Sequence, residues 1–153
     1  MAACEERITR DPRLLSIGYE GQKLDPFIYI LRAAQVQVLV DVRLNAIGRR
    51  PGFSKTALRS RLATEGIECV HLRALGNPRD NRQAFGATTS PARARFAALL
   101  DSTEARDALE KLCRLTQDAL VAVLCFEQNE SECHRMLIID AVQQMLRQTQ
   151  LAV

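Results

Sequence analysis

Four short runs of apolar and β-branched residues alternate with amphipathic stretches along the chain. These runs span residues 13–18, 36–42, 67–72 and 120–125. A nearly continuous run such as VQVLVDV at 36–42 is typical of a strand that is buried on both faces of a parallel sheet. Because the runs alternate with helical patterns, the sequence predicts an α/β fold: a single three-layer domain with a mainly parallel central sheet and helices on both faces.

Capping and turn residues indicate where the helices begin and end. Asp25 followed by Pro26 predicts a helix that is capped by the Asp25 side chain. Ser54 predicts the cap of the next helix, and Gly66 predicts its end. Further helices are expected at 92–100, at about 103–117, and from about Ser131 to 146.

The length of 153 residues is that of one domain. We expect a flexible tail at 1–12, the domain at 13–148 and a C-terminal tail at 149–153. Within the domain, the polar stretch from Gly76 to Pro91 shows no periodicity and predicts a long loop. Loops of this length are uncommon in compact domains and are often binding lids or partly disordered segments.

The composition, 47% hydrophobic and 25% charged, is that of an ordinary soluble protein. No apolar run approaches the roughly 18 residues that a membrane helix requires. The N-terminal stretch lacks the apolar core of a signal peptide, so we expect a cytoplasmic protein without membrane contact. Five scattered cysteines, an odd number, predict reduced thiols rather than a disulfide framework. The sequence gives no signal for the oligomeric state.

The predicted topology gathers chemically active residues at one place. The C-terminal ends of parallel strands meet at one edge of a sheet, and ligands of α/β proteins bind there. The residues that follow the four predicted strands are Tyr19, Glu20, Asp41, Arg43, His71 and the turn from Cys125 to Arg135, with Arg49 and Arg50 expected to overhang them. We therefore expect a binding site at this edge.

The motifs at these strand ends, in their order along the chain, resemble the domain of unknown function 488 family. The matching segments are Ile17-Gly18-Tyr19, Leu39-Val40-Asp41-Val42-Arg43, Arg49-Arg50-Pro51-Gly52-Phe53 with Lys55, Val70-His71-Leu72, Leu75-Gly76, and Leu124-Cys125 through Glu127 to Cys133-His134-Arg135. The resemblance covers Leu14 to Leu146. Family members commonly carry two glycines after the leucine at 75, whereas this chain has Gly76-Asn77. The resemblance supports the fold and the location of the site and implies no reaction.

Basic residues suggest an anionic ligand. Positions 43 to 61 contain no acid and six bases, namely Arg43, Arg49, Arg50, Lys55, Arg59 and Arg61. Guanidinium groups donate paired, charge-assisted hydrogen bonds to phosphate, so Arg43 is predicted to hold an anion. Arg135 and the N-terminus of the last helix, where His134 also lies, form a second predicted anion site. Three alternatives stay open: a structural Asp41–Arg43 interaction, a solvated helix face for Arg59 and Arg61, and neutralisation of His134 and Arg135 by Glu130 and Glu132.

Cys125 and Cys133 allow three further hypotheses beside simple packing in the protein interior. Cys125 could be a nucleophile whose thiolate is favoured by nearby cations, or the two cysteines could form a redox pair. A zinc site with His134 and the distant His71 is disfavoured, because adjacent residues on a helix point about 100° apart. The sequence therefore predicts no metal site and no cofactor.

Carboxylates and a histidine at the strand ends suit acid–base chemistry. Our leading hypothesis is a small enzyme that binds a phosphate-bearing ligand, a nucleotide or nucleic-acid end, for hydrolysis or group transfer. Arg43 and Arg135 would hold the anion, Tyr19 and Glu20 would contact the ligand, and Glu127, Asp41 or His71 would transfer protons. The first alternative is a non-catalytic nucleic-acid-binding module that uses the Arg43–Arg61 surface, and the second is a thiol redox protein.

Overall fold

The computed structural model describes residues 13–45, 50–81, 91–128 and 133–151. The predicted N-terminal tail and most of the long loop after Gly76 lie outside these ranges. No helix in the described ranges is long and apolar enough to cross a membrane. The last helix continues to Leu151, past the domain boundary that the sequence suggested at 148.

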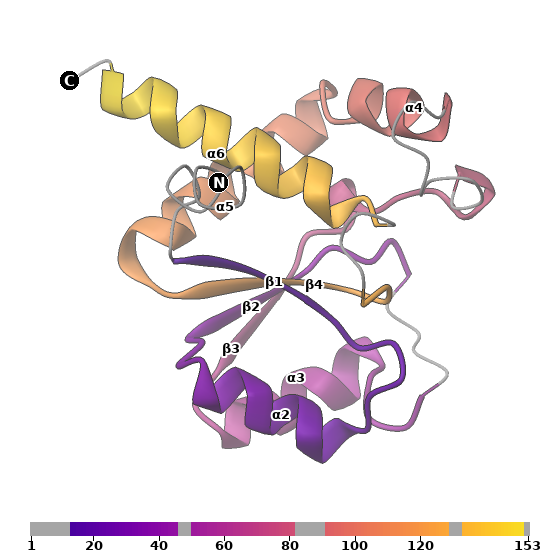
Figure 1. Ribbon diagram of the computed structural model, residues 1–153, viewed down its shortest axis with the longest axis vertical. Coiled ribbons are helices and arrows are strands. Elements are labelled where there is room, and N and C mark those ends of the chain that lie inside the picture. The colour runs from indigo at the N-terminus through magenta and orange to yellow at the C-terminus, as the bar shows by residue number, and fades with distance from the viewer. Residues whose placement is uncertain (1–12, 46–49, 82–90, 129–132, 152–153) are drawn as a thin grey trace, which may run out of the picture.

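A four-stranded parallel sheet forms the centre of the molecule, as predicted (Figure 1). Its strands are β1 (Leu14–Gly18), β2 (Val38–Asp41), β3 (Glu68–His71) and β4 (Val121–Cys125), in the spatial order β1-β4-β2-β3. Strand β4 is buried along its whole length and pairs with both β1 and β2. Its continuous VAVLC sequence suits this position, because neither face of the strand meets water.

Helices cover both faces of the sheet and complete the three layers (Figure 1). One face carries α2 (Leu24–Ala33) and α3 (Lys55–Thr64), and the other carries α4 (Pro91–Leu99), α5 (Thr103–Asp118) and α6 (Arg135–Leu151). Alternate residues of β2 enter the two cores: Leu39 packs with α2 and α3, and Val38 and Val40 pack with α5 and α6. Two short 3-10 helices, Arg73–Leu75 and Arg79–Asn81, follow β3.

The structure confirms the predicted start and end of α3 but not the predicted cap of α2. The Ser54 hydroxyl accepts a hydrogen bond from the Ala57 N–H, and Gly66 follows α3 with a φ of +74°, a conformation that glycine adopts without strain. The prediction for Asp25 was wrong, because α2 already begins at Leu24 and Asp25 lies in its first turn. Lys23 occupies the cap position and makes no side-chain cap hydrogen bond.

The last helix begins at Arg135 and not at Ser131. Residues 129–132 lie outside the described ranges, whereas Cys133 and His134 are described and form a turn that precedes α6. The His134 carbonyl accepts the N–H groups of Leu137 and Ile138, so His134 is the residue that immediately precedes the first turn of α6. The position of the helix start bears on whether the side chains of Cys133 and His134 can face the same point in the site.

Candidate functional site

The register of the sheet brings the four strand ends to one edge. Gly18 pairs with Cys125, and Asp41 pairs with both His71 and Leu124. Beyond the strands the ladder continues, since the Glu20 N–H donates to the carbonyl of Phe126 at 2.9 Å. The residues that the sequence placed at this edge are therefore neighbours, except for Arg49, which lies outside the described residues.

Arg43 lies inside the protein in a buried ion pair with Asp41. Its Nε and Nη2 atoms donate to the two carboxylate oxygens of Asp41 at 2.9 and 2.7 Å, and Nη1 donates to the Tyr19 hydroxyl at 3.2 Å and the Phe53 carbonyl at 2.6 Å. Burial alone would lower the pKa of Arg43, but the hydrogen bonds and charge of Asp41 outweigh burial and the pKa is raised. Only 5% of Arg43 is exposed. This geometry fits the alternative hypothesis, in which Asp41 and Arg43 form a structural interaction inside the protein.

Arg135 also donates its hydrogen bonds to the protein. Only 1% of the residue is exposed. Its Nε donates to the Ser16 hydroxyl at 2.7 Å, and its two terminal nitrogens donate to the carbonyls of Glu127 and Gln128. Arg135 therefore connects β1 to the loop that follows β4. It is placed to position that loop, not to face a solvent-borne phosphate.

Gly18 allows this loop to lie against the end of β1. A Cβ atom at position 18 would lie 2.0 Å from the carbonyl oxygen of Glu127, closer than two such atoms can approach. In the sequence, Gly18 stands out only as part of the Ile17-Gly18-Tyr19 motif. The close backbone approach depends on a contact across the sheet that local sequence does not encode.

Two thiols and an imidazole meet at the same edge, and we call Cys125, Cys133 and His134 the thiol–imidazole cluster. The Nδ1 atom of His134 lies 3.5 Å from the Cys133 sulfur and 3.8 Å from the Cys125 sulfur. The two sulfurs and this nitrogen all lie within 4.8 Å of one another, and all three residues are buried. Phe96 of α4 packs edge-on against the imidazole, a neighbour that the sequence analysis missed because 38 positions separate them.

The backbone around the cluster fixes its proton arrangement. His134 Nε2 lies 3.0 Å from the carbonyl of Val42, which can only accept, so Nε2 carries a proton and Nδ1 faces the sulfurs. A hydrogen bond with Cys125 is the largest cause that lowers the pKa of Cys133, helped by His134 and the Arg135 N–H and opposed by burial. The same bond, together with burial, raises the pKa of Cys125 well above its ordinary value. The hydrogen bond between the two thiols therefore favours the thiolate at Cys133 and the protonated thiol at Cys125.

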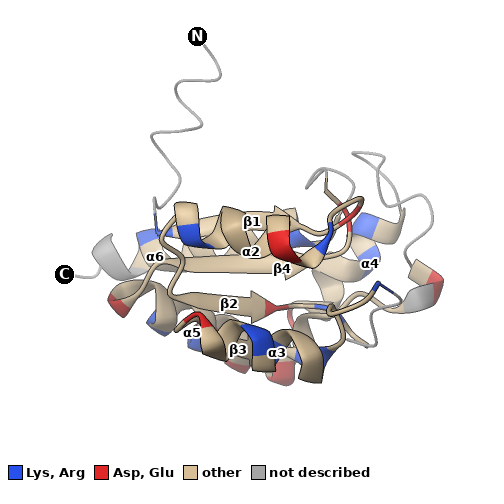
Figure 2. Cartoon of the chain, turned by 90° about the horizontal axis from the view of Figure 1, so that it is seen from below, with Lys and Arg blue, Asp and Glu red and all other residues tan. Residues whose placement is uncertain are grey.

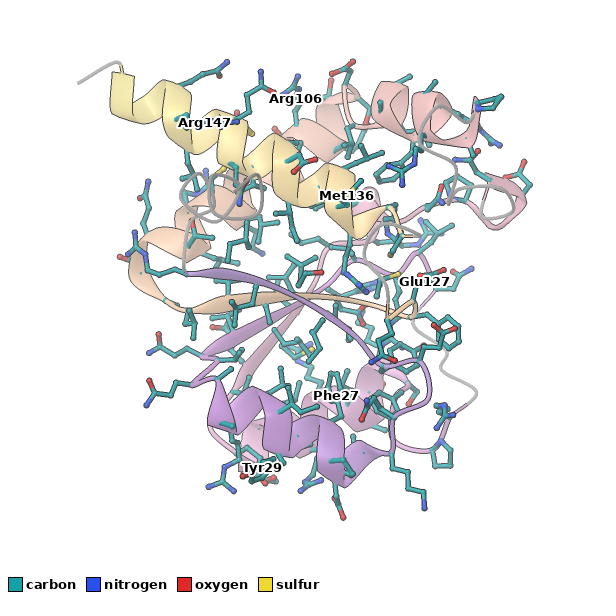
Figure 3. All side chains as sticks on the ribbon, viewed as in Figure 1. Phe27, Tyr29, Arg106, Glu127, Met136 and Arg147 are labelled. Carbon is teal, nitrogen blue, oxygen red and sulfur yellow. The ribbon has the colours of Figure 1, made fainter. Side chains whose placement is uncertain are left out.

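Glu127 lies on the loop after β4 (Figure 3), and its side chain interacts with Cys133 of the cluster. Burial, and then the negative charge of Cys133, raise the pKa of its carboxyl group. Its Oε2 atom is buried and makes no hydrogen bond with any residue that the structure describes. Buried oxygen atoms without partners are rare in folded proteins, because desolvation costs about 1–3 kcal/mol.

The other predicted site residues have more ordinary surroundings. His71 is half-buried and donates from Nε2 to the Arg43 carbonyl at 2.6 Å. Tyr19 is buried and stacks on Phe53 with 4.6 Å between ring centroids. Glu20 is exposed and accepts a hydrogen bond from the Gln128 N–H, and the exposed Arg50 donates to the Gln22 carbonyl.

The basic surface expected between Arg43 and Arg61 is divided in the structure. Arg43 is buried, and Arg61 pairs with Asp25 and Glu65 at 2.9 and 3.3 Å. Basic and acidic segments are interspersed on the side of α2 and α3 (Figure 2). The nucleic-acid hypothesis therefore keeps only Arg50, Lys55 and Arg59 as exposed cations from this stretch in the described residues.

Fold and site together define a single-domain, all-parallel α/β protein with a buried thiol–imidazole cluster and a carboxylate at the C-terminal edge of its sheet. The chain belongs to the family described as Domain of unknown function DUF488, whose profile matches residues 23–142. This match confirms the resemblance inferred from the motifs. No curated protein and no solved structure matches the chain.

Proposed function

We propose that this protein is an enzyme whose reacting centre consists of Glu127 and the thiol–imidazole cluster, and that it catalyses hydrolysis or group transfer. The observation that carries this proposal is the buried Oε2 atom of Glu127, which lacks a hydrogen-bond partner among the described residues. It lies where parallel sheets bind their ligands. Functional sites are where proteins keep a buried carboxylate oxygen that lacks a partner among the described residues, and the same carboxyl group interacts with Cys133 of the cluster.

Each group has a chemical role that its surroundings support. Glu127 is the candidate acid–base residue. The Arg135 side chain donates a hydrogen bond to the backbone carbonyl of Glu127, and this bond holds the Glu127 carboxyl group near the cluster. His134 is oriented by Val42, so its Nδ1 atom faces the sulfurs. Arg43 and Arg135 are positioning residues in this proposal. Because both make internal hydrogen bonds, the proposal does not include a phosphate group held by these arginines.

A substrate screen tests the proposal. The full chain would be incubated with carboxylic esters, phosphate esters, nucleosides and nucleotides, and products would be followed by absorbance and mass spectrometry. We expect turnover of at least one class, with a loss of about 100-fold or more in Glu127→Gln. Cys69→Ser is the matched control, because Cys69 is a half-buried thiol on β3 outside the cluster. No turnover of any class, or turnover equal in Glu127→Gln and wild type, would overturn the proposal.

A second candidate function, thiol redox chemistry, is favoured by the two sulfurs of the cluster. Cys125 and Cys133 are eight positions apart in sequence, yet their sulfurs lie within 4.8 Å. Oxidation by glutathione disulfide would join them: the two cysteines lose two electrons and two protons, and the oxidant is reduced to two thiols. Peptide mapping after equilibration in glutathione buffers tests this candidate. A Cys125–Cys133 disulfide in mildly reducing buffer would support it, and reduced cysteines at every ratio would exclude it.

A further inference from the structure

The atoms of the thiol–imidazole cluster are spaced as the ligands of a tetrahedral metal ion are. Zinc binds cysteine sulfur at about 2.3 Å and histidine nitrogen at about 2.0–2.1 Å, so a sulfur and a nitrogen on one tetrahedral ion lie roughly 3.6 Å apart. The observed distances from His134 Nδ1 to the sulfurs of Cys133 and Cys125 are 3.5 and 3.8 Å. The third spacing, between the two sulfurs, is at most 4.8 Å.

The surroundings of these atoms are those of a metal site. Metal-binding histidines usually donate their other ring N–H to a carbonyl or carboxylate, which fixes the ring and its tautomer. His134 meets this condition through Val42 at 3.0 Å. The Arg135 N–H points at the Cys133 sulfur at 3.5 Å, a contact that stabilises a thiolate ligand.

We propose that Cys125, Cys133 and His134 bind one zinc ion. Two thiolates and an imidazole in tetrahedral spacing select zinc among the common divalent ions, because magnesium and calcium prefer oxygen ligands. The sequence argued against zinc on the ground that Cys133 and His134 would diverge on a helix. That argument does not hold, because both residues precede α6 and lie in a turn.

Three protein ligands leave a fourth position for water, which is the pattern of catalytic rather than structural zinc sites. This part of the inference rests on the proposed function and makes it more specific. A zinc ion held by Cys125, Cys133 and His134 would supply an acidic water for hydrolysis, and Glu127 would accept a proton from that water and pass it to the leaving group. The reaction is hydrolysis and requires no partner other than water.

The test is metal analysis of the full chain, purified with a reductant and without chelators. We expect about one zinc per chain by elemental analysis. After zinc removal, added Co²⁺ should give the visible absorption of a tetrahedral site with thiolate ligands. Cys133→Ser and His134→Ala should lose at least tenfold in metal affinity, whereas Cys69→Ser and Cys113→Ser should keep it. Zinc below about a tenth of an ion per wild-type chain, or equal affinity in Cys133→Ser, would overturn the proposal.

A second measurement uses only the wild-type chain, so it does not depend on whether a variant folds. Bound zinc should raise the thermal unfolding temperature of the metal-free wild-type chain, whereas Mg²⁺, which prefers oxygen ligands, should leave it unchanged. An unfolding temperature that zinc does not raise would overturn the site. The two proposals can fail separately. Stoichiometric zinc without turnover of any substrate would support the metal site and reject the enzyme. Glu127-dependent turnover in a wild-type chain that takes up no zinc would support the enzyme and reject the metal site.

Discussion

Arg135 and Glu127 are joined through the backbone: the buried guanidinium donates to the Glu127 carbonyl, while the Glu127 side chain extends toward the thiol–imidazole cluster. The first residue of α6 thus holds the loop that follows β4. Because Arg135 also donates to Ser16 of β1, one side chain connects three elements at the edge of the sheet.

Replacement of Arg135 by lysine should destabilise the protein. A single ammonium group cannot reach Ser16 and both loop carbonyls, so buried acceptors would lose their donors. We expect the free energy of unfolding to fall by about 2–4 kcal/mol, measured by urea denaturation. Arg147→Lys on the exposed side of the same helix is the control (Figure 3) and should change it by less than about 0.5 kcal/mol. Equal effects of the two changes would contradict the role given to Arg135.

Gly18→Ala should displace the loop that carries Glu127. The added methyl group would overlap the Glu127 carbonyl, and the backbone would have to move to relieve the overlap. We expect a loss of about 1–3 kcal/mol in unfolding free energy, together with weaker metal binding. Gly21→Asn is the control for steric overlap, because nothing lies within 4 Å of a Cβ there; its φ of +75° costs asparagine less than other side chains, so a smaller loss is expected. A Gly18→Ala protein as stable as wild type would refute the close approach.

Asp41→Asn should be one of the most damaging polar substitutions in the chain. It would leave the Arg43 charge buried without its partner, which costs about 3–5 kcal/mol in unfolding free energy. The contrasting variant is Asp25→Asn, which breaks the solvent-exposed pair with Arg61 and should cost less than about 1 kcal/mol. Thermal or urea denaturation of both variants distinguishes the two environments. A small effect at Asp41 would mean that Arg43 can turn toward solvent, as the anion-binding hypothesis requires.

Cys69 should react slowly with alkylating agents while the protein is folded. Burial, followed by the charge of Asp41, raises the pKa of this thiol from 9.0 to about 11. Below pH 9 the folded chain should therefore hold about 100-fold less Cys69 thiolate than the unfolded chain. Because the folded state keeps its proton longer, the contribution of this thiol to stability is full below pH 9 and declines as the pH rises toward 11. Iodoacetamide labelling at pH 8, with and without urea, measures the ratio; equal rates would contradict it.

The strands and their common edge were predictable because both follow from simple rules. Apolar runs mark buried strands, and parallel pairing brings their C-terminal ends together, so Asp41 and Cys125 could be placed at one edge before any coordinates were known. Partners distant in sequence could not be predicted. Nothing local to Arg135 indicates that Ser16, 119 positions earlier, accepts its hydrogen bond.

The most consequential error concerned where α6 begins. With a start at Ser131, Cys133 and His134 would be adjacent on a helix and would diverge. With the start at Arg135, the turn before the helix directs both toward Cys125. The start of α6 thus differs by four positions between the prediction and the structure. With the predicted start, a metal site at Cys133 and His134 was disfavoured, and with the observed start we propose one.

The spatial order β1-β4-β2-β3 has a consequence for how the protein is made. Strands β1 and β2 do not pair with each other, since β4 lies between them and pairs with both. During synthesis on the ribosome, β1 therefore has no pairing strand until β4, which begins 103 positions after Gly18, has been translated. The strand that completes the sheet also delivers Cys125, so a nascent chain that has formed its hydrophobic centre has also gained the first residue of the thiol–imidazole cluster.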